Sequence, residues 1–274
     1  MATMRRVVFV WIAAVVALAG TAGVAHAQYG ARPMGSTNAA VGENYKVEIS
    51  LGFWTSDPDI QVSSESLGII GTRIDAVTDL GFQEETFRDW KIVLRPSKKF
   101  KFRFGYTPIH YEAESVLTRE IVFNGQKYTV GLPVTSDLDW KVWKIGIEYD
   151  FVYGDHGFVG FITDVKYTNA RVDIISPVTT EFSKVSVPIP TIGAVARVYV
   201  VKGLALNGEL TGMKLNYSDN EGKYIDFDTN VTYNFTNNVG AQLGYRKLHI
   251  EYTVDNDAGR AVLKGIYFGG VARF

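Results

Sequence analysis

The sequence contains no cysteine, only four histidines, and no long apolar run beyond its N-terminal region. The absence of cysteine excludes disulfides, so the stability of the protein must come from other interactions. The scarcity of histidine leaves few side chains that change charge near neutral pH, and hence few candidates for acid–base catalysis. A membrane-spanning helix is not expected either, because it would need about 20 consecutive apolar residues.

The first 27 residues have the layout of a secretory signal peptide. Arg5 and Arg6 precede an apolar run at 7–19, and small residues then lead to Ala27. We predict cleavage after Ala27, since a basic start, a short apolar core and a site of the A-x-A type mark such peptides. Residues 28–42, rich in Gly, Ala, Ser and Asn, are expected to be a flexible N-terminal segment, and 43–274 to be one domain.

The charge of the exported chain is close to balanced. Removal of the two signal-peptide arginines leaves 26 of the 28 basic residues against 29 acidic ones. This balance gives no basic footprint, so nucleic acid is not an expected partner. Tyrosine (15), phenylalanine (16) and glycine (27) are plentiful. In an exported chain without a helical span, these residues favour an all-β protein, of which membrane barrels are one class.

Ten segments alternate apolar and polar residues with a period of two, which is typical of β-strands. They are 45–53, 90–94, 100–124, 133–151, 159–168, 192–200, 204–211, 225–235, 239–252 and 261–274. Short and long connections alternate between them, as in antiparallel up-and-down sheets. The long stretch 55–85 could hide a further hairpin, so eight to twelve strands remain compatible with the sequence.

Two of these segments change phase along their length. After Pro108 the apolar positions move to Ile109 and Tyr111, and a similar change occurs at Leu248. Since proline within a strand is found at edges and bulges, we interpret Pro108 as such a site. The dipeptide at 124–125, Asn-Gly, is the strongest hairpin signal in the chain.

The last segment carries the most specific resemblance. In 261–274, apolar residues at 266 and 268 and small ones at 270 and 272 share one face with the terminal Phe274. Together with the signal peptide and the loop pattern, this segment resembles the closing strand of a small bacterial outer-membrane β-barrel protein. Many members carry an aromatic residue where this chain has Ala272. The resemblance covers the whole mature chain, 28–274, and does not identify a subfamily.

This resemblance implies a location in the cell outer membrane and a monomer surrounded by outer-membrane lipids and lipopolysaccharide. It also implies insertion by the barrel-assembly machinery, with Phe274 as the assembly signal. The last strand should pair with the first, at 45–53, because closure removes both sheet edges. The short connections would then face the periplasm.

The apolar faces are expected to meet lipid, and aromatic residues near strand ends to form interfacial girdles. The girdle candidates are Trp54, Trp90, Tyr106, Trp143, Phe151, Tyr233, Phe235 and Phe274. The polar faces should line the lumen with charges of both signs. The predicted lumen residues are Lys46, Glu48, Lys101, Arg103, Lys144, Glu148, Asp164, Lys166, Arg197, Glu209, Asp226, Asp228 and Arg246. Two readings stay open here: a filled network of ion pairs, or a narrow polar pore.

Only one constellation suggests catalysis. His110 with Glu112 and His249 with Glu251 lie at similar distances from their turns, so the two pairs could meet across the lumen as an acid–base or metal site. Otherwise they are solvated rim residues. Barrel enzymes such as omptin proteases and lipid A deacylases carry Asp–His or His–Ser spacings that are missing here.

Four aspartates, Asp57, Asp59, Asp75 and Asp79, fall in the long stretch 55–85. An EF-hand loop begun at Asp57 would need Gly at position 62 and Glu at position 68, where Val and Gly stand, so no calcium loop is expected. We expect no metal and no cofactor. The sequence thus predicts a non-enzymatic outer-membrane barrel, either structural or a narrow small-solute channel with long extracellular loops. The alternative is a barrel enzyme that acts on lipid A or peptides at the extracellular rim.

Deletion of Phe274 should impair assembly more than a deletion in the polar loop at 218–223. The reason is that the resemblance makes the terminal aromatic residue the recognition signal. Heat-modifiable gel mobility of membrane fractions measures the folded protein, and wild-type levels after the deletion would contradict the assignment.

Overall fold

The computed structural model describes residues 39–63, 71–177, 179–217, 220–254 and 257–274. The predicted signal peptide, its cleavage site and residues 28–38 lie outside the described residues. Among those described, no helix is long and apolar enough to cross a membrane. The structure is built of strands, three of them short: β2 (Ile74–Asp75), β5 (Ile121–Phe123) and β6 (Gln126–Tyr128). The long strands are β1 (Val47–Ser63), β3 (Glu85–Leu94), β4 (Phe100–Val116), β7 (Pro133–Gly154), β8 (Gly157–Ile175), β9 (Thr180–Val201), β10 (Leu204–Tyr217), β11 (Asn220–Asn234), β12 (Val239–Val254) and β13 (Asp257–Arg273).

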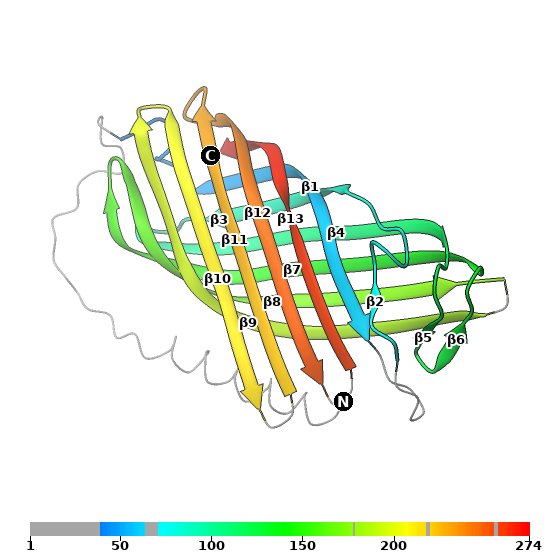
Figure 1. The fold of residues 1–274 in the computed structure, drawn as a ribbon. Coiled ribbons are helices and arrows are strands. Elements are labelled where there is room, and N and C mark those ends of the chain that lie inside the picture. Colours follow the sequence, from blue (N-terminus) through cyan, green and yellow to red (C-terminus); the bar gives the residue numbers. More distant parts are fainter. Residues whose placement is uncertain (1–38, 64–70, 178, 218–219, 255–256) are drawn as a thin grey trace.

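The ten long strands form a closed antiparallel barrel (Figure 1). Each strand pairs with its neighbour along the chain, and β13 pairs with β1 from Glu48↔Arg273 to Ser63↔Ala258. Phe274 extends this pairing, since its backbone N–H donates to the Val47 carbonyl at 2.9 Å. The predicted ten-stranded up-and-down barrel is therefore confirmed, as is the pairing of the last strand with the first.

The two ends of the barrel differ. At the short-turn end, tight turns follow β3, β7, β9 and β11. The opposite, long-loop end carries the segment between β1 and β3 and the β5–β6 hairpin (Figure 1). This hairpin turns at Asn124 and Gly125, whose φ angles of 50° and 81° fit a type I′ turn. The sequence signal was right, but the hairpin is separate and does not continue the long strands.

The strands extend further toward the long-loop end than the sequence suggested. β7 and β9 each have 22 residues, whereas crossing a bilayer takes about 9–11. β1 continues to Ser63, so its part at 55–63 is strand and not loop. The apolar patch expected at 67–70 lies outside the described residues. Roughly half of the barrel wall therefore stands beyond the apolar band.

The outer surface of the short-turn half is apolar. Its exposed side chains include Ile92, Phe104, Trp143, Leu243 and Phe268. Tyr106 and Trp143 face outward and contact each other with ring centroids 4.2 Å apart, near the upper limit of this band. Seven of the eight predicted girdle residues face outward. The prediction for Trp54 is wrong, because its side chain is fully buried inside the barrel.

The changes of phase in β4 and β12 are exchanges of polarity between the two faces. The β4–β7 register runs without interruption from Phe100↔Tyr149 to Val116↔Pro133, so Pro108 marks no bulge and no edge. Ile109 and Tyr111 point into the barrel, while His110 and Glu112 point outward. Beyond the lipid the outer face meets water, and the enclosed face must be filled by protein. The apolar residues of these parts were therefore wrongly assigned to the lipid-facing band.

A hydrophobic core fills the long-loop half. It contains Trp54, Ile109, Tyr111, Leu138, Trp140, Val142, Tyr224, Leu248 and Leu263 from the barrel wall. Residues of the end segments complete it, namely Ile74, Leu80, Phe82, Ile121, Phe123 and Tyr128. The barrel is thus sealed at this end by its own connections.

Polar contacts hold these end segments in place. The guanidinium of Arg119 donates to Asp79 and to the Arg73 carbonyl, which joins the two connections. Asp75 caps a turn by accepting from the Val77 and Thr78 amides at 3.0 Å each. Burial acts to raise the pKa of the Asp75 carboxyl, but these hydrogen bonds and one from Gln61 outweigh it, so the pKa lies below its usual value.

Ile109→Ala should lower the free energy of unfolding by about 2–5 kcal/mol, because it opens a cavity in this core. His110→Ala, on the exposed outer face one residue further along the same strand, should change it by less than about 0.5 kcal/mol. Urea titration of the reconstituted barrel measures both. Equal effects would contradict the assignment of faces.

Candidate functional site

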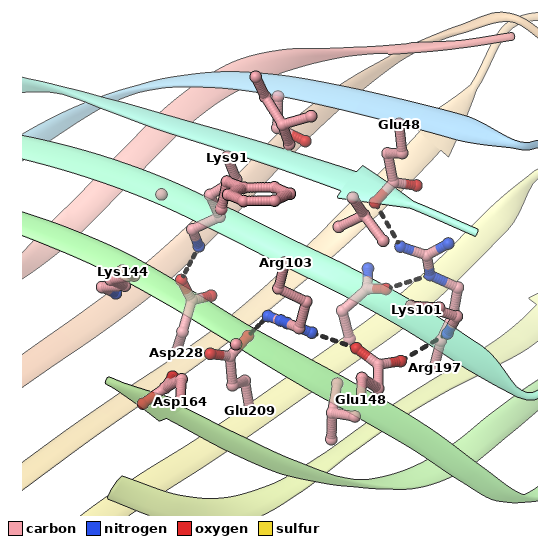
Figure 2. Close-up of a pocket in the computed structure, with 18 of the residues that line it drawn as sticks. Glu48, Lys91, Lys101, Arg103, Lys144, Glu148, Asp164, Arg197, Glu209 and Asp228 are labelled. Atoms are coloured by element: carbon pink, nitrogen blue, oxygen red, sulfur yellow. Dashed lines mark hydrogen bonds and ion pairs between the residues drawn. The ribbon is translucent and has the colours of Figure 1, made fainter. Parts of the chain in front are cut away.

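The interior of the short-turn half holds a dense network of charges, seen in Figure 2. Its basic members are Lys91, Arg95, Lys101, Arg103, Lys144, Lys166, Arg197, Arg246 and Arg273. Its acidic members are Glu43, Glu48, Asp89, Glu148, Asp150, Asp164, Glu209, Asp226 and Asp228. These two sets are equal in number. Charges enclosed by a barrel wall must be paired to be tolerated, and the balance allows this.

One chain of contacts crosses the lumen between β4, β7 and β10. Lys101 donates to Glu148 at 2.5 Å and forms an ion pair with Asp150 at 2.8 Å. Arg103 donates to Glu148 through one nitrogen and to Glu209 through another (Figure 2). Since β4 and β10 are not neighbours in the barrel, the Arg103–Glu209 contact spans the interior. This contact therefore places a pair of opposite charges within the lumen.

A second cluster lies where the network meets the apolar core. Arg246 binds Asp226 through two hydrogen bonds of 3.0 Å and reaches Asp89 at 3.0 Å. Its guanidinium also lies 4.9 Å from the ring centroid of Trp54. Lys166 lies at a similar boundary, with its ammonium 5.0 Å from the Tyr224 ring. Cation–π contacts of this kind join the charged layer to the aromatic one above it.

The segment 40–46 crosses the short-turn end. The backbone N–H of Ala40 donates to the backbone carbonyl of Asp155, and that of Val41 donates to the backbone carbonyl of Lys202. The backbone N–H of Gly42 donates to the side chain of Asn237. These three partners lie in three different turns, so the segment bridges the opening. The part of the predicted flexible segment that falls at 39–42 is instead held against the barrel.

Two side chains of this segment enter the lumen. Glu43 is fully buried and lies 3.3 Å from Arg95 and 3.7 Å from Arg197. The ring of Tyr45 is surrounded by the guanidinium groups of Arg95, Arg197 and Arg273, at 5.0–5.8 Å from its centroid. Arg273 and Arg197 also share Glu48, at 2.5 and 3.0 Å. An aromatic and arginine cluster thus closes the short-turn end.

Between this cluster and the core lies a cavity of about 90 Å³. Its lining includes Lys91, Arg103, Lys144, Glu209 and Asp228 (Figure 2). Because it is polar and larger than the roughly 10–15 Å³ that one water centre requires, it can hold a few water molecules.

Twelve of the thirteen predicted lumen residues face the interior. Lys46 does not: it is exposed at the short-turn end, before β1 begins, and its backbone N–H binds Phe274. Sequence reasoning missed Arg95 and Glu43, which lie outside the strands, so the period of two could not place them. Asp150 and Arg273 also belong to the network, and both fall on inward positions of the period-two pattern, where the alternation of the sequence places them.

The two His–Glu pairs do not meet. His110 and His249 lie on the outward faces of β4 and β12, which are separated by β13, β1 and β3. His249 instead contacts Glu251 on its own strand, at 2.8 Å. The potential ligand atoms of His110, Glu112 and Asp137 lie within 4.8 Å of one another, so these three surface residues could hold a metal ion.

The four aspartates of 55–85 do not come together in one place either. Asp57 and Asp59 project outward from β1 and contact Lys264 at 3.4 Å and Arg260 at 2.9 Å on β13. Asp75 and Asp79 lie together in the end segment, where the Asp79 carboxylate accepts from the Asp75 backbone N–H at 2.8 Å. They do not form one calcium-like cluster.

Comparison with solved structures agrees with this architecture. OmpT, an outer membrane protease of Escherichia coli, matches with a TM-score of 0.55 and 9% identity over 83% of this chain and 96% of that chain. The fold is that of an outer-membrane β-barrel. The attachment invasion locus protein Ail of Yersinia pestis (TM-score 0.37, 8% identity, 84% and 99% covered) and the toluene transporter TodX of Pseudomonas putida (0.35, 10%, 87% and 94%) are also similar. No protein-family model and no curated protein matches the sequence.

Arg246→Met should lower the free energy of unfolding by about 3–5 kcal/mol, because Asp226 and Asp89 would lose their buried partner. Arg260→Met on the neighbouring strand breaks exposed pairs with Asp59 and Glu251 and should cost less than about 1 kcal/mol. Urea unfolding of both variants in the same lipid tests this contrast. A small effect of Arg246→Met would show that the network carries little stability.

Proposed function

We propose that the protein is a non-conducting, non-enzymatic outer-membrane barrel that holds a folded body at the cell surface. The observation that carries this proposal is that three successive layers of the chain fill the lumen. From the short-turn end upward, segment 40–46, the charge network and the apolar core follow one another. A solute would have to displace all three, and each is packed or paired.

The apolar core is the strongest barrier. A hydrated ion could exchange with water beside charged groups, but it would lose its hydration among Trp54, Ile109 and Leu263, which are all fully buried. This supports a structural barrel over the narrow channel that the sequence also allowed. OmpT shows that a barrel of this fold can be a protease, but a likeness at 9% identity extends to the fold alone.

In this proposal the long-loop half is the part of the barrel that faces the exterior of the cell. Its wall is strand, its interior is a hydrophobic core and its outer face is charged, as in a water-soluble domain. This half is therefore packed around its own core, unlike an open set of loops. The hairpin at 121–128 and the segment at 71–82 form its end surface.

In planar bilayers the purified chain should give no discrete conductance steps at low voltage. Tyr45→Ala should also stay silent, since it loosens only the short-turn end and leaves the core in place. A porin in the same bilayer serves as the positive control. Stable unitary steps from the wild-type chain would refute the closed lumen.

The sidedness can be tested separately in cells. An epitope inserted after Gly125 should be labelled on intact cells, because the hairpin belongs to the long-loop end. An epitope inserted after Lys202, in the turn between β9 and β10, should be labelled only after the membrane is opened. The reverse pattern would invert the proposed orientation.

A further inference from the structure

Four lysines follow the upper limit of the apolar band on four consecutive strands. On β12 and β13 they come two positions beyond Tyr245 and Ile266, and on β10 and β11 four positions beyond Leu210 and Phe227. All four occupy outward positions of the period-two pattern. We call them the lysine patch: Lys214, Lys223, Lys247 and Lys264.

The patch places like charges directly opposite each other. In the β10–β11 ladder Lys214 pairs with Lys223, and in the β12–β13 ladder Lys247 pairs with Lys264. Directly opposed residues have Cβ atoms about 4.5–5.5 Å apart, and like charges at that distance destabilise a sheet. In the β11–β12 ladder Lys223 lies opposite Glu251 and Lys247 lies opposite Phe227, so the two lysine pairs are offset along the strands. Each pair is a cost that an anion between its two ammonium groups would remove.

Acidic neighbours compensate the patch only in part. Lys223 lies 3.5 Å from Glu251, and Lys264 lies 3.4 Å from Asp57. Lys214 and Lys247 have no ion-pair partner within the part of the chain that the structure describes. The face of β10 to β13 therefore carries uncompensated positive charge at the edge of the apolar band.

The outward basic residues of β7 and β8 differ. Lys141 donates to Asp139 at 2.8 Å, and Arg171 donates to Asp173 at 2.6 Å, so each has an acidic partner two residues along its own strand. Both also lie just beyond the apolar band, which ends at Trp143 on β7. They supply a matched comparison at which the local charge is already neutralised.

We propose that the lysine patch binds the phosphate groups of phosphorylated lipids in the outer leaflet, with lipopolysaccharide as the occupant. The position fits, because headgroups begin where the outward face stops being apolar, and the acyl chains of the same lipid can lie along Leu210, Phe227, Tyr245 and Ile266 below. Lysine suits this role, since its flexible stem can follow the apolar surface while its ammonium reaches a phosphate. A phosphate between opposed lysines also removes their repulsion.

This inference rests on the outer-membrane location in the proposed function, and not on a closed lumen. Conductance and lipid binding are separate measurements. A pore found in planar bilayers would leave the lysine patch untouched, and a failure to bind phosphorylated lipid would leave the lumen closed.

The test is native mass spectrometry of the refolded full chain in detergent, titrated with diphosphoryl lipid A. Wild-type protein should bind it at least about tenfold more tightly than lipid A from which both phosphates have been removed. Lys214→Gln/Lys247→Gln should weaken binding by about 30-fold, since each lysine near an anionic surface contributes roughly a fivefold factor. The matched Lys141→Gln/Arg171→Gln variant should change it by less than about twofold.

Heat-modifiable gel mobility shows that each variant is folded before it is titrated. Equal loss in the two double variants would overturn the proposal, because it would reduce the effect to net charge. Equal binding of phosphorylated and dephosphorylated lipid A to the wild-type chain would overturn it as well. That comparison needs no variant and decides the matter even if a substituted barrel fails to fold.

Discussion

The structure depends on closure of one sheet. Backbone N–H and C=O groups cannot be left unpaired in lipid, and the register between β1 and β13 satisfies the groups that the first and last barrel strands would otherwise expose. Once the ring is closed, every strand has one face inside and one outside. The other features of the protein depend on what each face contacts at each height along the barrel.

On the outer face the surroundings of a strand change once, from lipid to water, and its outward residues change there from apolar to polar. On β4 the outward series passes from Phe102 and Phe104 to His110 and Glu112, while the inward series passes from Lys101 and Arg103 to Ile109 and Tyr111. The two series exchange character within a few residues of Pro108. A single strand thus carries two opposite amphipathic patterns without any break in its ladder.

Inside, the barrel is filled in two different ways. The short-turn half pairs charges across the lumen, as Arg103 does with Glu148 and Glu209. The long-loop half packs aromatic and aliphatic side chains, and Arg246 and Lys166 link the two halves through Trp54 and Tyr224. A charged layer alone could exchange with water and ions, but an apolar layer stacked on it cannot. The closed lumen that we propose rests on this combination, more than on either layer separately.

Local alternation in the sequence was sufficient to determine the ten strands, their antiparallel order, the inward position of residues such as Glu148 and Asp226, and the type of turn at Asn124. These features depend on a period of two and on turn residues, both of which are local. Alternation did not show at which height the apolar residues of a strand change from the lipid-facing side to the interior, so Trp54, Ile109 and Leu248 were predicted to face lipid. It also could not bring Glu43 to Arg95, separate His110 from His249, or oppose Lys247 and Lys264. Those relations depend on the height of a residue in the closed ring and on the register of its neighbours, and only the folded barrel sets both.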